Sequence, residues 1–356
     1  MLRYLEVKAE ILHIASAMNP GEKLPDRTTL SKRLDTTRTT VDKAIGELVK
    51  EGKLLSQKGS GTYVSGTQSE EGITENWCVI VPDISESVYA TLVSGADAFA
   101  QQHNINIILC NSNGDQNLQL KYIKRQLYND VSGFIIVPVI TTNVQENLLI
   151  YNSLINSQKT FVFCNRSVDG ISAPIVTSND FYGGYIATKH LIGMGYTRIA
   201  YVAEQKYVTS IERCKGYISA LLENQMDIHR RMIILPDNRK PFHDNLYLIE
   251  NMIDEEKPDA IFCFNDFVAI QVMNLLKQKG IAISDEIGII GYDDIESCKS
   301  QTPLLSSVSH NTYAIGQMAA SVLYRKTHGM STNEGIDYYL FQPELIIRDS
   351  CLGKNG

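Results

Sequence analysis

Apolar residues recur at helical spacing in three segments at the start of the chain, and a short hairpin pattern follows them. The apolar stripes are Tyr4, Val7, Ile11, Ile14 and Met18, then Leu30 and Leu34, then Val41, Ala44, Ile45 and Leu48. Asp26 is placed to cap the second helix, and Gly52 to end the third in a left-handed turn. Two strand segments, 54–56 and 62–64, then flank a basic, glycine-rich tip at 58–61. This order predicts a winged helix-turn-helix; a small helical bundle with a surface hairpin is the alternative.

From residue 77 onward, short apolar runs alternate with amphipathic stretches. The runs predict buried parallel strands at 77–81, 105–109, 133–137, 160–164, 198–202, 232–235, 260–264 and 287–291. The amphipathic stretches predict helices near 89–102, 116–129, 144–156, 180–194, 212–225, 244–255, 266–279 and 312–328. Such alternation implies right-handed crossovers in doubly wound sheets, and eight strands over this length favour two lobes. The predicted fold class is therefore α/β, with a winged helix-turn-helix before a two-lobed, doubly wound domain.

A polar segment between the two patterns marks a domain boundary. Residues 67–76 are rich in Ser, Thr, Glu and Asn and have no hydrophobic period, which predicts a linker. It would join the winged helix-turn-helix at 1–66 to the two-lobed α/β domain at 77–350. Within the body, we expect the chain to cross between the lobes near 165–170, near 305–310 and near 330.

Length and charge agree with a two-part protein. The chain has 356 residues, enough for two or three domains. Residues 1–66 hold 11 Lys and Arg against 8 Asp and Glu, a net charge of +3, which leaves −10 for the rest of a chain whose total is −7. A weakly basic head on an acidic body suits DNA contact at one end of the chain.

The cysteines and the N-terminal sequence bear on cofactors and location. The seven cysteines form no C-x-x-C pair and lack the histidine spacing of a zinc site, so we expect buried thiols, no metal and no cofactor. The N-terminus has no signal-peptide pattern, and no apolar run approaches membrane-spanning length. We therefore expect a cytoplasmic protein that does not interact with the membrane.

The start of the third helix has the chemistry of a DNA reader. Arg38 and the neighbouring threonine hydroxyls can bind guanine and phosphate where a recognition helix enters the major groove, and the hairpin tip can follow the backbone. The candidate DNA-binding residues are Arg27, Thr28, Thr37, Arg38, Thr39, Thr40, Lys43, Lys58, Gly59, Ser60 and Gly61.

This head closely resembles the GntR-type DNA-binding domain. The resemblance rests on 21–25, 37–41, 44–45, Leu48, 51–52 and 59–64. It has two departures: Asp26-Arg27 stands where the family usually has Ser-Glu, and Asp42 stands where the family has a basic residue. Asp42 would repel phosphate or accept a hydrogen bond from cytosine, so no known operator sequence is transferred to this chain.

Polar side chains follow several of the apolar runs in the body. Ligands of doubly wound sheets bind beyond the carboxyl ends of the strands, so these positions are candidates for an effector site. The candidate effector-binding residues are Ser85, Tyr89, Asn165, Arg166, Arg213, Asn265, Asp293 and His310. Such groups suit a neutral polyol, because hydroxyls both donate and accept hydrogen bonds while the C–H face of a sugar packs on an aromatic ring.

The body resembles the LacI-type regulatory domain, which is itself similar to periplasmic sugar-binding proteins. The most specific stretches are 213–217, 258–266 and 285–294. By position, the resemblance places effector contacts on Arg213, Asn265 and Asp293, with Asn165 and Arg166 next. Relatives often have Asn-Pro-Phe-Phe where this chain has residues 86–89, so the identity of the sugar stays open.

Several of these residues have structural alternatives. Arg213 and Asp293 would also suit a salt bridge across the cleft or a helix cap, Tyr89 a core position, and His310 a helix entry or hinge. Two further acids are expected to cap helices or brace the hinge, namely Asp266 and Asp294.

A GntR-type head on a LacI-type body resembles the arabinose-responsive repressors of the AraR type. The resemblance implies a repressor of carbohydrate-utilisation genes that leaves its operator when a small sugar, a pentose such as L-arabinose or another monosaccharide, binds between the lobes. We expect a homodimer on a palindromic operator. The alternative is a regulator that uses a sugar phosphate, a nucleoside or another small metabolite, as co-repressor or activator. An enzyme is not expected, because nucleophile-elbow, P-loop, H-E-x-x-H and G-x-G-x-x-G patterns are missing.

Overall fold

In the computed structural model the chain forms two compact units, Met1–Thr74 and Glu75–Gly356. We call them the head and the body. The structure describes residues 2–16, 18–19, 21–50, 52–57, 60–65, 75–129, 131–140, 144–205, 208–236, 245–330 and 337–353. Within these ranges, no helix is both long enough and apolar enough to cross a membrane.

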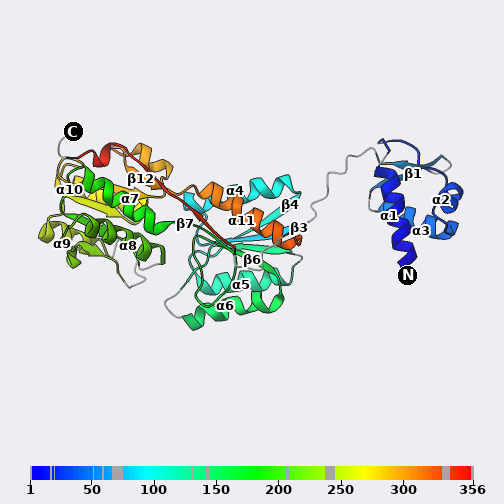
Figure 1. The fold of residues 1–356 in the computed structure, drawn as a ribbon, viewed down its shortest axis with the longest axis horizontal. Coiled ribbons are helices and arrows are strands. Elements are labelled where there is room, and N and C mark those ends of the chain that lie inside the picture. Colours follow the sequence, from blue (N-terminus) through cyan, green and yellow to red (C-terminus); the bar gives the residue numbers. More distant parts are fainter. Residues whose placement is uncertain are drawn as a thin grey trace. The chain divides into compact units, whose positions relative to one another are not determined.

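The head has the predicted order of helices and hairpin. Its elements are α1 (Leu2–Ser16), α2 (Arg27–Arg33), α3 (Arg38–Lys50), β1 (Leu54–Gln57) and β2 (Gly61–Val64), with the two strands antiparallel (Figure 1). Asp26 caps α2 by accepting hydrogen bonds from the amides of Thr28 and Thr29, and Gly52 after α3 has a φ of +71°. The buried core is Val7, Ile11, Ala15, Leu24, Leu30, Val41, Ala44, Ile45, Leu48 and Leu54. Apart from Tyr4, whose side chain lies outside the described residues, the predicted apolar stripes therefore form one core, and the winged helix-turn-helix is confirmed.

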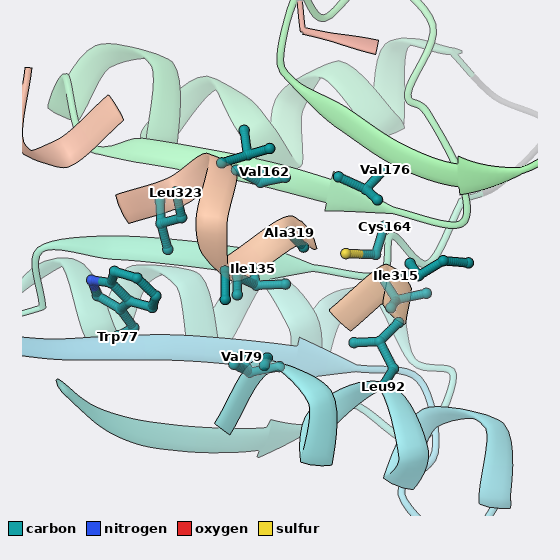
Figure 2. Close-up of a cluster of buried hydrophobic side chains, with 14 of the residues drawn as sticks. Trp77, Val79, Leu92, Ile135, Val162, Cys164, Val176, Ile315, Ala319 and Leu323 are labelled. Atoms are coloured by element: carbon teal, nitrogen blue, oxygen red, sulfur yellow. The ribbon is translucent and has the colours of Figure 1, made fainter. Parts of the chain in front are cut away.

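The first lobe of the body, lobe 1, is built on a parallel sheet in the order β13-β7-β6-β5-β3-β4. Its strands are β3 (Glu75–Val81), β4 (Ile105–Asn111), β5 (Gly133–Ile136), β6 (Thr160–Cys164), β7 (Ile175–Ser178) and β13 (Tyr338–Phe341). Its helices are α4 (Ser87–Gln102), α5 (Gln116–Leu127), α6 (Val144–Ser157) and α11 (Thr312–Thr327). α4 and α11 lie on one face of the sheet, and α5 and α6 lie on the other (Figure 1). Their apolar side chains bury the two faces. Figure 2 shows Ala319 of α11 close to Ile135 of β5 in the first of these cores.

Lobe 2 is built on a second sheet in the order β14-β12-β11-β10-β8-β9. Its strands are β8 (Ile199–Val202), β9 (Ile233–Ile234), β10 (Ala260–Cys263), β11 (Gly288–Tyr292), β12 (Ser306–Ser309) and β14 (Glu344–Ile346). Its helices are α7 (Asp180–Gly193), α8 (Val208–Glu223), α9 (Leu246–Glu256) and α10 (Asp266–Lys279), with short 3-10 turns at Arg230–Met232, Glu296–Ser300 and Asp349–Cys351. Core residues of α7 and α8 cover one face and those of α9 and α10 the other. Both lobes are doubly wound, as predicted.

The structure contains strands that the sequence pattern did not predict. They are β7, β12, β13 and β14, and β14 runs antiparallel to β12. β7 and β12 are rich in Ser and Thr, and β13 and β14 are partly exposed, so none of them forms an apolar run. The predicted strands and helices all exist, with small differences at their ends.

The first and third crossings between the lobes lie elsewhere than predicted, and the second lies close to the predicted position. Residues 175–178 still pair with lobe 1, so the first crossing follows β7 rather than lying at 165–170. The chain returns between Ser309 and Thr312, and the third crossing lies between β13 and β14 rather than near 330. Both differences follow from strands that the sequence pattern did not predict. β7 and β13 belong to the sheet of lobe 1, so the chain leaves that lobe later than expected in each case.

Candidate functional site

The helix α3 has one face in the core of the head and one face open to solvent. The buried face is Val41, Ala44, Ile45 and Leu48. The predicted DNA-binding residues Arg38, Thr39 and Lys43 are exposed on the same helix, and Thr40 is half-buried. Thr37 Oγ1 accepts a hydrogen bond from the Thr40 amide at 3.3 Å, so Thr37 caps the start of α3. The polar residues at the first turn of α3 are therefore accessible to a binding partner, as the prediction of a recognition helix requires.

Two of the residues at which the head departs from the GntR pattern are partners in the structure. Arg27, the first residue of α2, forms an ion pair through Nε with Asp42 Oδ1 of α3. Arg27 Nη1 also donates a hydrogen bond to Thr62 Oγ1 of β2 at 3.4 Å. Arg27 therefore joins both helices to the hairpin, and the Asp42 carboxylate is not an isolated negative charge on α3.

The hairpin supplies the remaining candidates of the head. Residues 58–59, predicted at its tip, lie outside the described residues. Ser60 is exposed, and its hydroxyl makes a hydrogen bond to the Tyr63 hydroxyl. Gly61 has a φ of +134°, and a Cβ there would lie 2.6 Å from Lys23 Cε. Position 61 therefore favours glycine, which lets the hairpin pack against the segment before α2.

A cavity of about 390 Å³ lies between the two lobes, beyond the carboxyl ends of their strands. From lobe 1 it is lined by Pro82, Asp83, Glu86, Val88, Tyr89, Asn113, Gly114, Val139, Ile140, Asn165, Arg166, Thr177 and Ser178. From lobe 2 and the crossing segments it is lined by Asp180, Glu204, Gln205, Thr209, Arg213, Phe264, Asn265, Asp293 and His310. Its volume falls within the usual range for small-molecule sites, and its place at the strand ends is where doubly wound sheets bind ligands.

The cavity brings together most of the predicted effector-binding residues. These are Tyr89, Asn165, Arg166, Arg213, Asn265, Asp293 and His310. Ser85 does not line it, because both its amide and its hydroxyl donate hydrogen bonds to Asp83 Oδ1. Ser85 therefore shapes the turn after β3 and brings Asp83, rather than itself, to the cavity.

Arg213 of α8 is buried in lobe 2 and held by several groups at once. Its Nε donates to Asp180 Oδ1 at 2.8 Å, and its Nη1 donates to the Phe264 carbonyl at 2.5 Å. The guanidinium carbon lies 3.4 Å from the centre of the Tyr292 ring. Burial by itself would lower the pKa of Arg213, but Asp180, Tyr292 and Asp293 together raise it. Arg213 is thus a preorganised cation at the wall of the cavity, and its salt bridge and its place in the site are compatible.

Arg166 and Asn165 lie together after β6. Arg166 Nη2 donates to the Tyr89 hydroxyl at 3.0 Å, and its Nη1 donates to the Pro138 carbonyl at 3.3 Å. The Tyr89 ring packs in the core of lobe 1, so this residue is both a core aromatic and part of the cavity wall. Asn165 has a left-handed φ of +60°, and among the described atoms its buried Oδ1 has no hydrogen-bond partner. A buried amide oxygen without a partner is costly, so Asn165 Oδ1 is an acceptor that a bound ligand would satisfy.

Three further predicted residues come from the ends of β10, β11 and β12. Asn265 Oδ1 caps α10 by accepting from the Val268 amide at 2.9 Å. Asp293 has a φ of +103°, and its Oδ1 lies 3.3 Å from Nε2 of His310. His310 packs edge-on against the Tyr292 ring and stands at the crossing into α11, so it combines the predicted hinge position with a place in the cavity wall.

Sequence reasoning missed several acids of the cavity. Asp83 and Glu86 follow β3, Glu204 follows β8, and Asp180 opens α7 directly after β7. The rule that ligands bind beyond strand ends would have identified Glu204 if it had been applied to β8. Asp180 had no such signal, because β7 was itself not predicted.

These acids give the cavity an excess of negative charge. Its lining has the carboxylates Asp83, Glu86, Asp180, Glu204 and Asp293 and the guanidinium groups Arg166 and Arg213. Burial, and then the charges of Glu204, Asp293 and Asp83, raise the pKa of Glu86 to about 7. Burial also raises the pKa of Glu204. The cavity is therefore rich in hydrogen-bond acceptors and disfavours an added anion.

Two acids next to the site have structural roles, as expected. Asp266 is fully buried at the start of α10, where its Oδ1 accepts from Ser307 Oγ at 2.6 Å and its Oδ2 from the Ile295 amide at 2.9 Å. Asp294 forms a 2.7 Å ion pair with Arg348. Neither lines the cavity, so they brace the ends of β11 and β12 rather than contact a ligand.

Comparison with known proteins identifies both parts of the chain. A model of bacterial regulatory proteins of the gntR family matches residues 3–64, and a model of the periplasmic binding protein-like domain matches residues 188–351. The chain therefore joins a gntR-type DNA-binding domain to a periplasmic binding protein-like domain, which is an architecture of bacterial transcriptional regulators.

Particular regulators resemble it over nearly their whole length. The arabinose metabolism transcriptional repressor of Geobacillus stearothermophilus is 28% identical over 354 residues, which cover 98% of this chain and 97% of that protein. The repressor of the same name from Halalkalibacterium halodurans is 23% identical over 360 residues, with 97% and 94% covered. The fold is shared with the solved complex of the transcriptional regulator CelR with cellobiose, at a TM-score of 0.69 and 20% identity, covering 88% of this chain and 90% of that one. Because the two arabinose metabolism repressors are transcriptional regulators, they bear out the prediction that the chain is not an enzyme.

Proposed function

We propose that this chain is a repressor of carbohydrate-utilisation genes that leaves its operator when a monosaccharide binds in the cavity between its lobes. The observation that carries the proposal is the set of polar groups at the strand ends, with Arg213 and Arg166 held in place and Asn165 Oδ1 left without a partner. The exposed face of α3 supplies the DNA contact. Residues of one chain would thus provide both the sugar site and the DNA-binding surface.

The charge of the cavity favours a neutral ligand over a phosphorylated one. Five carboxylates face two guanidinium groups, one of which is already bonded to Asp180. Sugar hydroxyls can donate to these carboxylates, and the Phe264 ring offers an apolar surface for a sugar face. A phosphate would add like charge to an acidic wall. A pentose such as L-arabinose is the leading candidate, which the names of the relatives support.

We propose further that two copies act together on DNA. One α3 helix reads few base pairs, so a specific operator requires a second copy on a second half-site, about one helical turn away or a multiple of it. The bodies, which form the larger unit of the chain, would carry the pairing surface. The operator is then a palindrome whose symmetry matches that of the protein.

Ligand binding would act by shifting the balance between open and closed arrangements of the two lobes. A sugar that contacts Asn165 and Arg166 in lobe 1 and Arg213 and Asp293 in lobe 2 is bound best when the lobes are closed. Such a ligand changes DNA affinity only to the extent that it prefers one arrangement.

A ligand panel tests this proposal. Thermal unfolding of the full chain is measured with pentoses, deoxyhexoses, hexoses, nucleosides and sugar phosphates, and a neutral monosaccharide should raise the melting temperature most. The same compounds are then added to the protein bound to a duplex selected from random DNA, and the active sugar should release it. No response to any sugar would overturn the proposal, a response to phosphates alone would favour the sugar-phosphate alternative, and tighter DNA binding would favour a co-repressor.

A further inference from the structure

The ion pair between Arg27 and Asp42 assigns a role to the acid on α3. We propose that Asp42 does not read a base, but orients Arg27 so that its guanidinium binds a phosphate at the edge of the groove that α3 enters. The inference rests on the proposed DNA-binding function and concerns how the operator is recognised.

Arg27 lies at the start of the helix that precedes α3. It opens α2, and in a helix-turn-helix the helix before the recognition helix crosses the DNA backbone while the recognition helix enters the groove. Arg27 is only partly buried, with 31% of its side chain exposed. A cation at the start of α2 is therefore placed for a phosphate rather than for a base edge.

Two neighbouring side chains fix the orientation of the Arg27 guanidinium. Its Nε pairs with Asp42 on α3, and its Nη1 donates to Thr62 on β2 at 3.4 Å. A guanidinium has five N–H donors in a fixed planar fork, so fixing Nε and Nη1 also fixes the direction of Nη2. The Asp42 carboxylate and the Thr62 hydroxyl thus fix the guanidinium and leave one of its edges available to a ligand.

Operator selection with the full-length protein tests the proposal. Wild type, Arg27→Gln, Asp42→Asn and the double variant each select duplexes from random DNA, and binding to the selected wild-type site is measured over a range of salt concentrations. All four should select the same base sequence. Arg27→Gln should bind about tenfold more weakly and reduce the slope of log K against log salt by about 1. Asp42→Asn should reduce the slope in the same way. The double variant should bind the selected site no more weakly than Arg27→Gln and have the same salt slope.

A matched control separates this effect from the removal of any acid on α3. Glu47, also on α3, pairs with Lys8 of α1 at 3.4 Å, so Glu47→Gln removes one negative charge and one ion pair of the same kind. It should leave selection and salt slope unchanged. Circular dichroism should show that each variant is folded, because an exposed ion pair contributes little to the free energy of unfolding.

The outcomes distinguish the possibilities. If Asp42→Asn changes the preferred base at one position of each half-site while Arg27→Gln does not, Asp42 reads a base and the inference is wrong. If neither variant changes affinity or slope, the pair only braces the head and the inference is also wrong. A wild-type chain that selects no duplex would overturn the proposed function, and this inference with it.

Discussion

Arg213 Nε donates a 2.8 Å hydrogen bond to Asp180 Oδ1, and both side chains stand at the wall of the cavity between the lobes. The bond joins α8 to the first residue of α7, which is also the point where the chain enters lobe 2. The Arg213 cation at the cavity wall is therefore tied to the crossing between the lobes.

Replacement of Arg213 by lysine should weaken the ligand response. Lysine keeps the charge opposite Asp180, but it cannot also donate to the Phe264 carbonyl and stack on the Tyr292 ring. We expect sugar affinity to fall by about tenfold or more, measured by calorimetry, while DNA binding without sugar is kept. Arg198→Lys is the control, because Arg198 is an exposed arginine of the same lobe that also donates to backbone carbonyls. Unchanged sugar affinity in Arg213→Lys would contradict the assigned site.

Replacement of Gly184 by alanine should destabilise lobe 2. A Cβ at Gly184 of α7 would lie 2.1 Å from the Arg213 carbonyl oxygen, whereas a Cβ at Gly193 of the same helix meets nothing within 4 Å. We expect Gly184→Ala to cost about 1–3 kcal/mol and to weaken sugar binding, because α8 must move. Gly193→Ala should stabilise by about 0.4–1 kcal/mol. Calorimetric melting temperatures of both variants provide the measurement, and equal values would show that the helices are less closely packed than the structure indicates.

Stability of the body should fall as the pH rises towards 7, partly through Asp266. Burial, and then the charge of Asp293, raise the pKa of Asp266 to about 7 from an ordinary value of 3.8. Between these values the folded state holds more protons than the unfolded state, so the free energy of unfolding decreases with increasing pH. Asp266→Asn should make this dependence shallower by up to about 1.4 kcal/mol per pH unit between pH 5 and 7. Denaturant unfolding at several pH values measures it, with Asp254→Asn on the exposed side of α9 as the control.

The acids of the cavity should set the preference for neutral over phosphorylated sugars. Glu86→Gln combined with Glu204→Gln removes two carboxylates from the wall and should improve the relative binding of the sugar phosphate. Because the pKa of Glu86 is about 7, the same preference should narrow in the wild type as the pH falls below 7 and this group becomes neutral. Isothermal titration with a sugar and its phosphate gives both results. Glu212→Gln, on α8 in an ion pair with Lys215, is the control, and the same preference in all variants would contradict the electrostatic argument.

Removal of Arg38 should separate DNA binding from sugar binding. Arg38 is exposed at the first turn of α3, so Arg38→Ala should weaken specific operator binding by about 1–3 kcal/mol and leave the sugar-induced thermal shift intact. Lys50→Ala, at the other end of α3, is the matched control. Fluorescence anisotropy with a selected operator measures the effect. Loss of the thermal shift as well would indicate a folding defect rather than a lost contact.

Much of the fold was readable from the sequence because periodicity reports burial directly. The apolar stripes of α1, α2 and α3 predicted the core of the head, and eight apolar runs predicted the central strands of both lobes. The hydrophobic pattern did not predict β7 and β12, because both contain Ser or Thr at buried positions. Such a strand forms when neighbouring strands pair with its backbone N–H and C=O groups. Pairing partners supply that stability, and they are not visible in a local pattern.

The candidate site divides in the same way. The rule that ligands bind beyond strand ends placed Asn165, Asn265 and Asp293 near one cavity from sequence alone, because strand ends of a parallel sheet meet at one edge. What only the tertiary structure decided is which charges face each other: Asp180 with Arg213, and Arg27 with Asp42. Each of these pairs joins residues on different helices, and ion pairing depends on distances of a few ångströms that the packing of whole elements determines.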